Sequence, residues 1–120
     1  MRNGAPATLS PLQAFVAGHA RLFVLTGAGC STPSGIPDYR DRNGAWKRKP
    51  PITLQAFMGE AYTRARYWAR SLVGWPSFGS ARPNATHRAL AELERHGKVD
   101  LLVTQNVDGL HQRAGSRHVV

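Results

Sequence analysis

The sequence has a single cysteine, Cys30, among its 120 residues. One thiol cannot form an internal disulfide and cannot supply a multi-cysteine zinc site, so we assign no metal ligands. No run of eighteen apolar residues predicts a transmembrane helix. The first twenty residues lack the charged start and long apolar block of a secretory signal. These absences predict a cytoplasmic protein with no membrane partner.

Acidic residues are also scarce, with seven Asp and Glu against sixteen Lys and Arg and a net charge of +9. Much of the positive charge lies from Arg40 to Lys49 and at Arg64, Arg66 and Arg70. A basic, solvated surface explains this pattern; attraction to a nucleic acid or to a smaller anionic ligand such as a dinucleotide is the alternative. Because no nucleic-acid-binding motif accompanies the charge, we predict no specific nucleic-acid partner.

The order of apolar runs predicts an α/β fold with parallel strands. Residues 22–26 and 99–104 are short apolar runs typical of buried strands, and a third strand is predicted to begin at Val119. A helix is predicted over residues 10–18, where Ser10 and Gln13 have the spacing of a capping box, and another over residues 84–96. Strands alternating with helices imply crossover connections between parallel strands.

The middle of the chain predicts a long loop and a helical region. Residues 31–51 are dense in turn residues and are predicted to form a long ordered loop; long loops in compact domains are usually functional or disordered. Residues 53–73 have helical periodicity, with a break predicted near Gly59. Residues 74–83 are rich in Gly, Pro and Ser and are predicted to form a connection.

A glycine turn follows the first predicted strand, in the segment Gly27-Ala28-Gly29-Cys30-Ser31. In an α/β sheet, ligands bind beyond the carboxyl ends of the strands, and glycines there allow the backbone to approach a phosphate. The spacing departs from the G-x-G-x-x-G pattern because position 32 is threonine. A dinucleotide site and a purely structural turn both remain open on this segment alone.

Two further segments carry polar side chains suited to a binding site. In residues 35–40 (GIPDYR), Arg40 is able to contact a phosphate or to pair with Asp38, and Tyr39 is able to shield a reacting sugar from water. Residues 104–108 (TQNVD) follow the second strand, and they offer amides for ribose hydroxyls or a water and a carboxylate for a carboxamide. A surface turn with a local ion pair and an ordinary polar loop are the alternatives.

Together these segments resemble the signature blocks of the sirtuin family. The resemblance is carried by residues 27–40 (GAGCSTPSGIPDYR), by residues 104–115 (TQNVDGLHQRAG) and by the helix start at 83–87 (PNATH). The segments Arg66–Arg70 and Val73–Pro76 look closest to the class II branch. The resemblance implies the N-terminal part of a Rossmann-like, parallel-sheet NAD-binding domain with a helical small-domain insertion.

The resemblance also implies a domain layout and a set of NAD-binding residues. Residues 1–120 would form a truncated catalytic domain. Its Rossmann-like parts would lie at 20–50 and 84–120, and its helical small-domain segment at about 51–83. The residues implied to bind NAD are Gly27, Ala28, Gly29, Ser31, Ile36, Pro37, Asp38, Tyr39, Arg40, Gln105, Asn106, Val107 and Asp108.

The activity implied is NAD-dependent protein-lysine deacylation, in which the acyl group of a modified lysine passes to ADP-ribose and nicotinamide is released. Asn106 and Asp108 would assist catalysis, whereas the general-base histidine and the four zinc cysteines of the family are expected after Val120. The alternative is an inactive module that binds NAD or ADP-ribose. Tyr67 and Arg70 resemble a pair that reads acidic acyl groups; an exposed arginine beside a core tyrosine is the other interpretation.

Overall fold

A computed structural model describes residues 7–120, and the first six residues of the predicted domain lie outside the described residues. Its main body is a small parallel sheet formed by β1 (Leu22–Thr26) and β2 (Val99–Thr104). Val119 forms a parallel bridge to Leu102 on the other side of β2. This bridge is supported by bonds of 2.9 Å from the Val120 amide to the Leu102 carbonyl and 2.8 Å from the Thr104 amide to the Val120 carbonyl. The predicted α/β class, with parallel strands, is confirmed.

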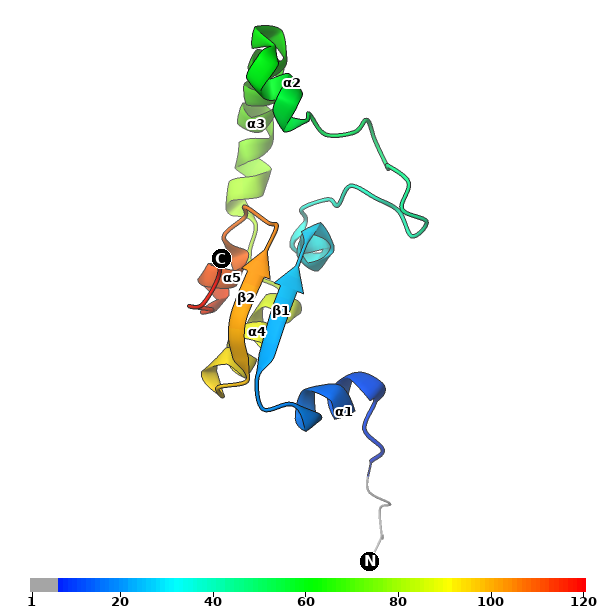
Figure 1. Ribbon diagram of the computed structural model, residues 1–120. Coiled ribbons are helices and arrows are strands. Elements are labelled where there is room, and N and C mark those ends of the chain that lie inside the picture. Colours follow the sequence, from blue (N-terminus) through cyan, green and yellow to red (C-terminus); the bar gives the residue numbers. More distant parts are fainter. Residues whose placement is uncertain (1–6) are drawn as a thin grey trace, which may run out of the picture.

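Two helices cover one face of the sheet. They are α4 (Ala85–Arg95) and α5 (Leu110–Ala114), which contact each other, and α4 also packs on β2 (Figure 1). Leu102 and Leu110 are each only 1% exposed, and they form the centre of this small core. The predicted capping of α4 by Asn84 is confirmed, and Gly97 follows the helix in the left-handed conformation.

The other face of the sheet is open among the described residues. Phe23 is 66% exposed and Leu25 is 62% exposed, because they alternate along β1 with the partly buried residues of the opposite face. The prediction of a fully buried strand is therefore wrong for this face. The first helix, α1 (Pro11–Gly18), begins at the predicted capping box formed by Ser10 and Gln13, and none of its residues is buried.

A helical arm extends away from the sheet (Figure 1). It consists of α2 (Leu54–Gly59) and α3 (Ala61–Ser80), which meet at Glu60, so the predicted break near Gly59 is confirmed. The predicted connection over residues 74–83 is wrong for residues 74–80, because α3 continues through Pro76 to Ser80, and it is confirmed for residues 81–83, which link α3 to α4. Aromatic packing accompanies this extension: the rings of Trp75 and Phe78 lie 6.0 Å apart.

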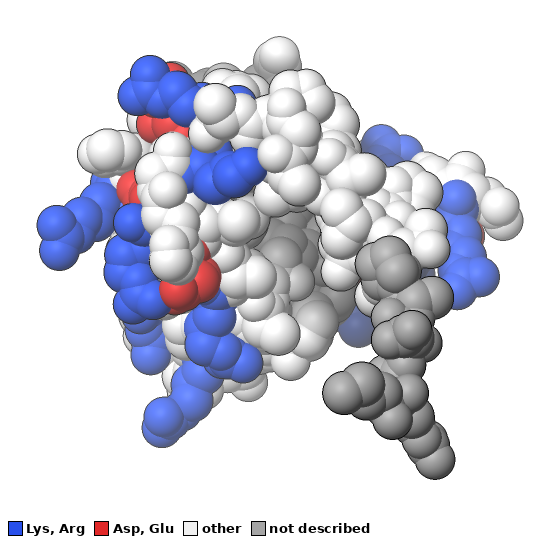
Figure 2. All heavy atoms as spheres, turned by 90° about the horizontal axis from the view of Figure 1, so that it is seen from below, with Lys and Arg blue, Asp and Glu red and all other residues white. Residues whose placement is uncertain are grey.

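No helix within residues 7–120 is both long enough and apolar enough to cross a membrane. Basic side chains project from the surface, with few acidic groups between them, in the view from below (Figure 2).

Candidate functional site

The carboxyl ends of β1 and β2 place two of the predicted polar segments side by side. A 3-10 helix, η1 (Ala28–Ser34), starts directly after Gly27 and ends at Gly35, which has a positive φ of 87°. The segment after β2 is tied to β1 by a 3.1 Å bond from the Gln105 amide to the Thr26 carbonyl. Because parallel strands end at the same edge of a sheet, the glycine turn and residues 105–108 meet there.

Ser31, Asn106 and Asp108 form one hydrogen-bonded group at this edge. The Ser31 hydroxyl donates to Asp108 Oδ2 at 2.6 Å, and Asp108 Oδ1 accepts the Leu110 amide at 2.9 Å at the start of α5. Asn106 Nδ2 donates to the Gly27 carbonyl at 2.9 Å and lies 3.3 Å from Ser31 Oγ. Side chains from η1 and from the loop after β2 therefore hold one another in position.

His87 completes this group, although the sequence analysis placed it only in the helix start at residues 83–87. Its Nδ1 accepts the Asn84 amide at 3.0 Å, so in the neutral ring the proton must sit on Nε2. Nε2 lies 3.3 Å from Ser31 Oγ and donates to it, which leaves the Ser31 hydroxyl free to donate to Asp108. The pKa of His87 is lowered mainly by burial, against the opposing charge of Asp108, and the ring is 0% exposed. The Asn84-x-x-His87 spacing of a capping box was the sequence signal for this placement.

His111 is a second buried imidazole at the site. Its Nε2 lies 2.8 Å from Thr26 Oγ1, whose own hydroxyl donates to Thr104 Oγ1 at 2.8 Å, so the ring donates through Nε2. Within the described part of the chain, His111 Nδ1 is buried without a hydrogen-bond partner. Burial, followed by the neighbouring His87, lowers the pKa of His111. The two rings lie edge to face with centroids 4.9 Å apart.

Cys30 lies beside the two imidazoles, and the three side chains are close enough together to bind one metal ion. Its Sγ is 4.0 Å from His87 Nε2 and 3.9 Å from His111 Nε2. The hydrogen bonds oppose metal binding, however. A neutral imidazole has one lone pair, and that of His87 already accepts the Asn84 amide at Nδ1, so a metal at Nε2 would require a doubly deprotonated ring.

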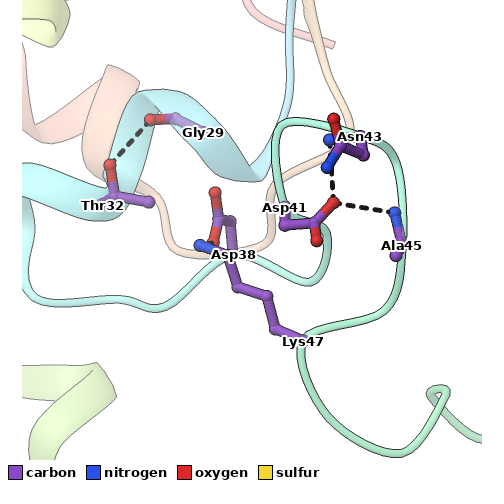
Figure 3. Close-up of polar contacts among 7 residues, drawn as sticks. All are labelled: Gly29, Thr32, Asp38, Asp41, Asn43, Ala45 and Lys47. Carbon is purple, nitrogen blue, oxygen red and sulfur yellow. Dashed lines mark hydrogen bonds and ion pairs between the residues drawn. The ribbon is translucent and has the colours of Figure 1, made fainter.

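The loop that carries Asp38, Tyr39 and Arg40 is arranged by contacts of its own (Figure 3). Lys47 Nζ pairs with Asp38 Oδ1 at 2.6 Å, so the alternative pairing of Asp38 with Arg40 is wrong. The Arg40 guanidinium lies 3.7 Å from the centroid of the Trp46 ring and donates to the Gly44 carbonyl at 2.6 Å. Of the predicted residues in this loop, Ile36 is joined to the strand-end group, through a 3.4 Å bond from its amide to the Ser31 carbonyl.

The remaining predicted residues are mainly solvent-facing. Val107 is 89% exposed and Tyr39 is 59% exposed, while Gly29, Pro37 and Gln105 are also exposed. On the helical arm, Tyr67 packs edge-on against Phe57 and Trp68, each at 5.2 Å between ring centroids. Tyr67 is 43% exposed and Arg70 is exposed, so Tyr67 is not a core residue.

A parallel α/β sheet with a polar group at the carboxyl ends of adjacent strands has the arrangement in which open α/β sheets bind their ligands. The chain belongs to the Sir2 family, whose model matches residues 27–120.

Relatives and solved structures support this assignment. An NAD-dependent protein deacetylase of Xanthomonas campestris pv. campestris is 71% identical over 109 residues, covering 91% of this chain and 37% of the relative. One from Bordetella pertussis is 70% identical over 112 residues, covering 93% and 41%. A Sir2 homologue–NAD complex matches with a TM-score of 0.69 and 42% identity, covering 91% of this chain and 43% of that chain. A complex of Sir2 with a p53 peptide and NAD+ matches with a TM-score of 0.74 and 33% identity, covering 95% and 45%. The chain thus spans about two fifths of the length of these relatives.

Proposed function

We propose that this chain is the N-terminal part of an NAD-dependent protein-lysine deacetylase, and that the group Ser31–Asn106–Asp108 binds the nicotinamide side of NAD. The observation that carries the proposal is the convergence of hydroxyl, amide and carboxylate at the ends of two parallel strands. The relatives are named as NAD-dependent protein deacetylases, and the chain spans 37% and 41% of the two described above. Because the chain covers only part of these relatives, deacetylation by the whole protein is itself part of the proposal.

The residues at the strand ends fit NAD chemically. Asp108 accepts one hydrogen bond at each carboxylate oxygen, so each oxygen retains a lone pair for the N–H of a carboxamide. The turn at Gly27, Ala28 and Gly29 leads directly out of β1, and an added Cβ at Gly29 would meet no atom within 4 Å. Bound NAD would supply an electrophilic ribose carbon with nicotinamide as the leaving group.

The chain's own residues orient the ligand in this proposal. Asp108 holds the carboxamide, Asn106 orders the ribose or a water beside it, and Gln105 meets the nicotinamide ribose. His87, kept neutral by burial, donates to Ser31 and so directs the serine proton toward Asp108. Asp108 thereby remains an acceptor, which is the form that a carboxamide N–H requires.

The loop residues Ile36, Pro37, Asp38, Tyr39 and Arg40 are proposed to line the nicotinamide side once NAD is bound. Tyr39 and Arg40 are exposed, and Arg40 is held by Trp46 and Gly44. Binding of NAD would therefore require these contacts to be exchanged for contacts with the ligand. Val107, which is 89% exposed, is proposed to contact the same ligand.

The acylated lysine of a protein substrate is the proposed second partner. Assignment to the class II branch, from residues 66–76, is part of this proposal. Tyr67 and Arg70, both accessible on α3, are proposed to read an acidic acyl group, because a guanidinium fork fits a carboxylate. Replacing Arg70 with glutamine would then reduce turnover of a succinylated peptide more than turnover of an acetylated one.

Asp108→Asn provides the test of NAD binding. Isothermal titration of NAD should show an affinity at least about tenfold weaker than that of the wild type, because a carboxylate acceptor is lost. Asp100→Asn is the matched control, since Asp100 lies at the opposite end of β2 and pairs with the exposed Arg21 at 3.0 Å. Equal affinity in both variants would contradict the assignment.

An activity measurement then separates the two functions. Nicotinamide release from an acetyl-lysine peptide by the full-length protein, lost in Asp108→Asn, would establish the deacetylase. Saturable NAD binding without release would favour the alternative, a module that binds NAD or ADP-ribose. This alternative rests on the partial coverage of the relatives.

A further inference from the structure

Three arginines line one hollow on the surface beside the start of α4. Arg82 and Pro83 come from the turn between α3 and α4, Arg88 from α4, and Arg113 and Ala114 from α5. The hollow has a volume of about 370 Å³, and none of the described residues that line it is acidic. Three elements that are separate in the sequence thus bring three positive charges to one place.

Two of these guanidinium groups are held in position by backbone carbonyls. Arg88 Nη1 donates to the Pro83 carbonyl at 2.8 Å, and Arg113 Nη1 donates to the Ala81 carbonyl at 2.6 Å. A guanidinium has five N–H donors, so each bond leaves several donors for a ligand. Because the groups are already oriented, less conformational entropy is lost when an anion binds.

The acidic residues on the same helix are engaged elsewhere. Glu92 bonds to Arg95 and to His96, and Glu94 accepts the backbone amides of Arg117 and His118. The pKa of His87 is lowered mainly by burial and raised by the charge of Asp108. The charge of Arg88 contributes further to lowering it. The positive potential of the hollow is therefore available to a ligand.

We propose that this hollow is a binding site for a phosphoryl group. The planar guanidinium matches the oxygens of a phosphate with paired hydrogen bonds. Three positive charges also match the double negative charge of a phosphate better than the single negative charge of a carboxylate. Arginine clusters recognise phosphorylated side chains through the same chemistry. Free phosphate and phosphoserine share this group, and the experiment distinguishes them. The site is independent of the NAD proposal.

The test is an NMR titration of the isotope-labelled 120-residue chain with inorganic phosphate and, separately, with phosphoserine. We expect saturable shifts of the Arg82, Arg88 and Ala114 amides with both ligands, and none with serine. Tighter binding of phosphoserine would identify a phosphorylated side chain as the source, whereas equal binding would identify free phosphate. Arg82→Gln should weaken binding about three- to tenfold, as expected for loss of a charged donor at an exposed site. An unchanged affinity would overturn the proposal.

Two controls keep the result interpretable. Arg95→Gln removes the same charge from α4 outside the hollow and should leave the phosphate affinity unchanged; an equal loss would indicate unspecific attraction and overturn the proposal.

Arg88→Gln and Arg113→Gln each remove a bond to a backbone carbonyl, so Arg82→Gln, whose side chain is exposed, is the primary variant. NAD affinity in Arg82→Gln should equal that of the wild type, so failure here leaves the assignment of Asp108 intact.

Discussion

Asn84 connects two parts of the site through one side chain. Its Oδ1 accepts the Thr86 amide at 2.9 Å and so caps α4, while its Nδ2 donates to the Cys30 carbonyl at 2.8 Å and to Ser34 Oγ at 3.0 Å. The cap is a local interaction, and the other two bonds cross from α4 to η1. The residue therefore couples the helix start to the glycine turn.

Replacing Asn84 with alanine should lower the free energy of unfolding by about 2 kcal/mol or more, because a cap and two partly buried bonds are lost together. Urea denaturation followed by circular dichroism measures this. Ser10→Ala is the matched control: it removes the cap of α1, which has no buried residue, and should cost about 1 kcal/mol or less. Equal losses would show that the bonds to η1 contribute little.

The two buried histidines make stability depend on pH. Both pKa values are lowered in the folded state, chiefly by burial, so the unfolded chain binds more protons below its ordinary histidine pKa of about 6.5. Stability contributed by the neutral rings is complete above that pH and is lost as pH falls below it. The free energy of unfolding should therefore decrease between pH 7 and pH 5.

His87→Asn is expected to flatten this pH dependence, and urea titrations at pH 7, 6 and 5 measure it. Replacement of the exposed His19, whose Nδ1 contacts the Phe15 carbonyl at 2.7 Å, should leave the slope unchanged. A slope that is the same in the His87 variant and the wild type would contradict the assignment of the pH dependence to the buried rings.

At the scale of the elements, α3 shows where local rules were insufficient. Gly74, Pro76 and Gly79 predicted a connection, yet all three lie inside the helix. The two glycines differ in surroundings. A Cβ at Gly74 would meet no atom within 4 Å, whereas a Cβ at Gly79 would lie 3.1 Å from the Trp75 ring.

This difference gives a matched pair of variants. Gly74→Ala should raise the free energy of unfolding by up to about 1 kcal/mol, since alanine favours a helix and the space is open. Gly79→Ala should give a smaller gain or a loss, because the indole must shift. Thermal unfolding measures both; equal gains would show that the Trp75 ring moves freely.

Elements that are specified by local signals were predicted from the sequence, whereas long-range contacts were not. Capping residues and strand runs act locally, so the starts of α1 and α4 and the bounds of β1 were predicted correctly. The approach of His87 to Ser31 joins positions 56 residues apart, and nothing in either segment alone specifies it. Likewise, the residues of β1 are nearly all apolar, so its sequence alone does not show which face of the strand is covered.

At the scale of the whole molecule, we expect the exposed face of β1 to promote self-association. Phe23 and Leu25 are both more than 60% exposed and lie on the same face of the strand. Exposed apolar surface of this kind promotes association. Phe23→Thr should reduce self-association of the 120-residue chain while changing its free energy of unfolding by less than about 0.5 kcal/mol. Sedimentation velocity at several concentrations measures this, and Val73→Thr on the helical arm is the control; an equal effect of both would contradict a role for the β1 face.

Asp108 divides its carboxylate between a side chain and the first turn of a helix. One oxygen takes the Ser31 hydroxyl, and the other takes the Leu110 amide at the start of α5. A ligand that binds Asp108 is therefore expected to hold the carboxylate in place and to slow local opening of its bond to that amide. The rate at which the Leu110 amide proton exchanges with deuterated solvent becomes a built-in reporter of occupancy at the strand ends, readable without any label on the ligand.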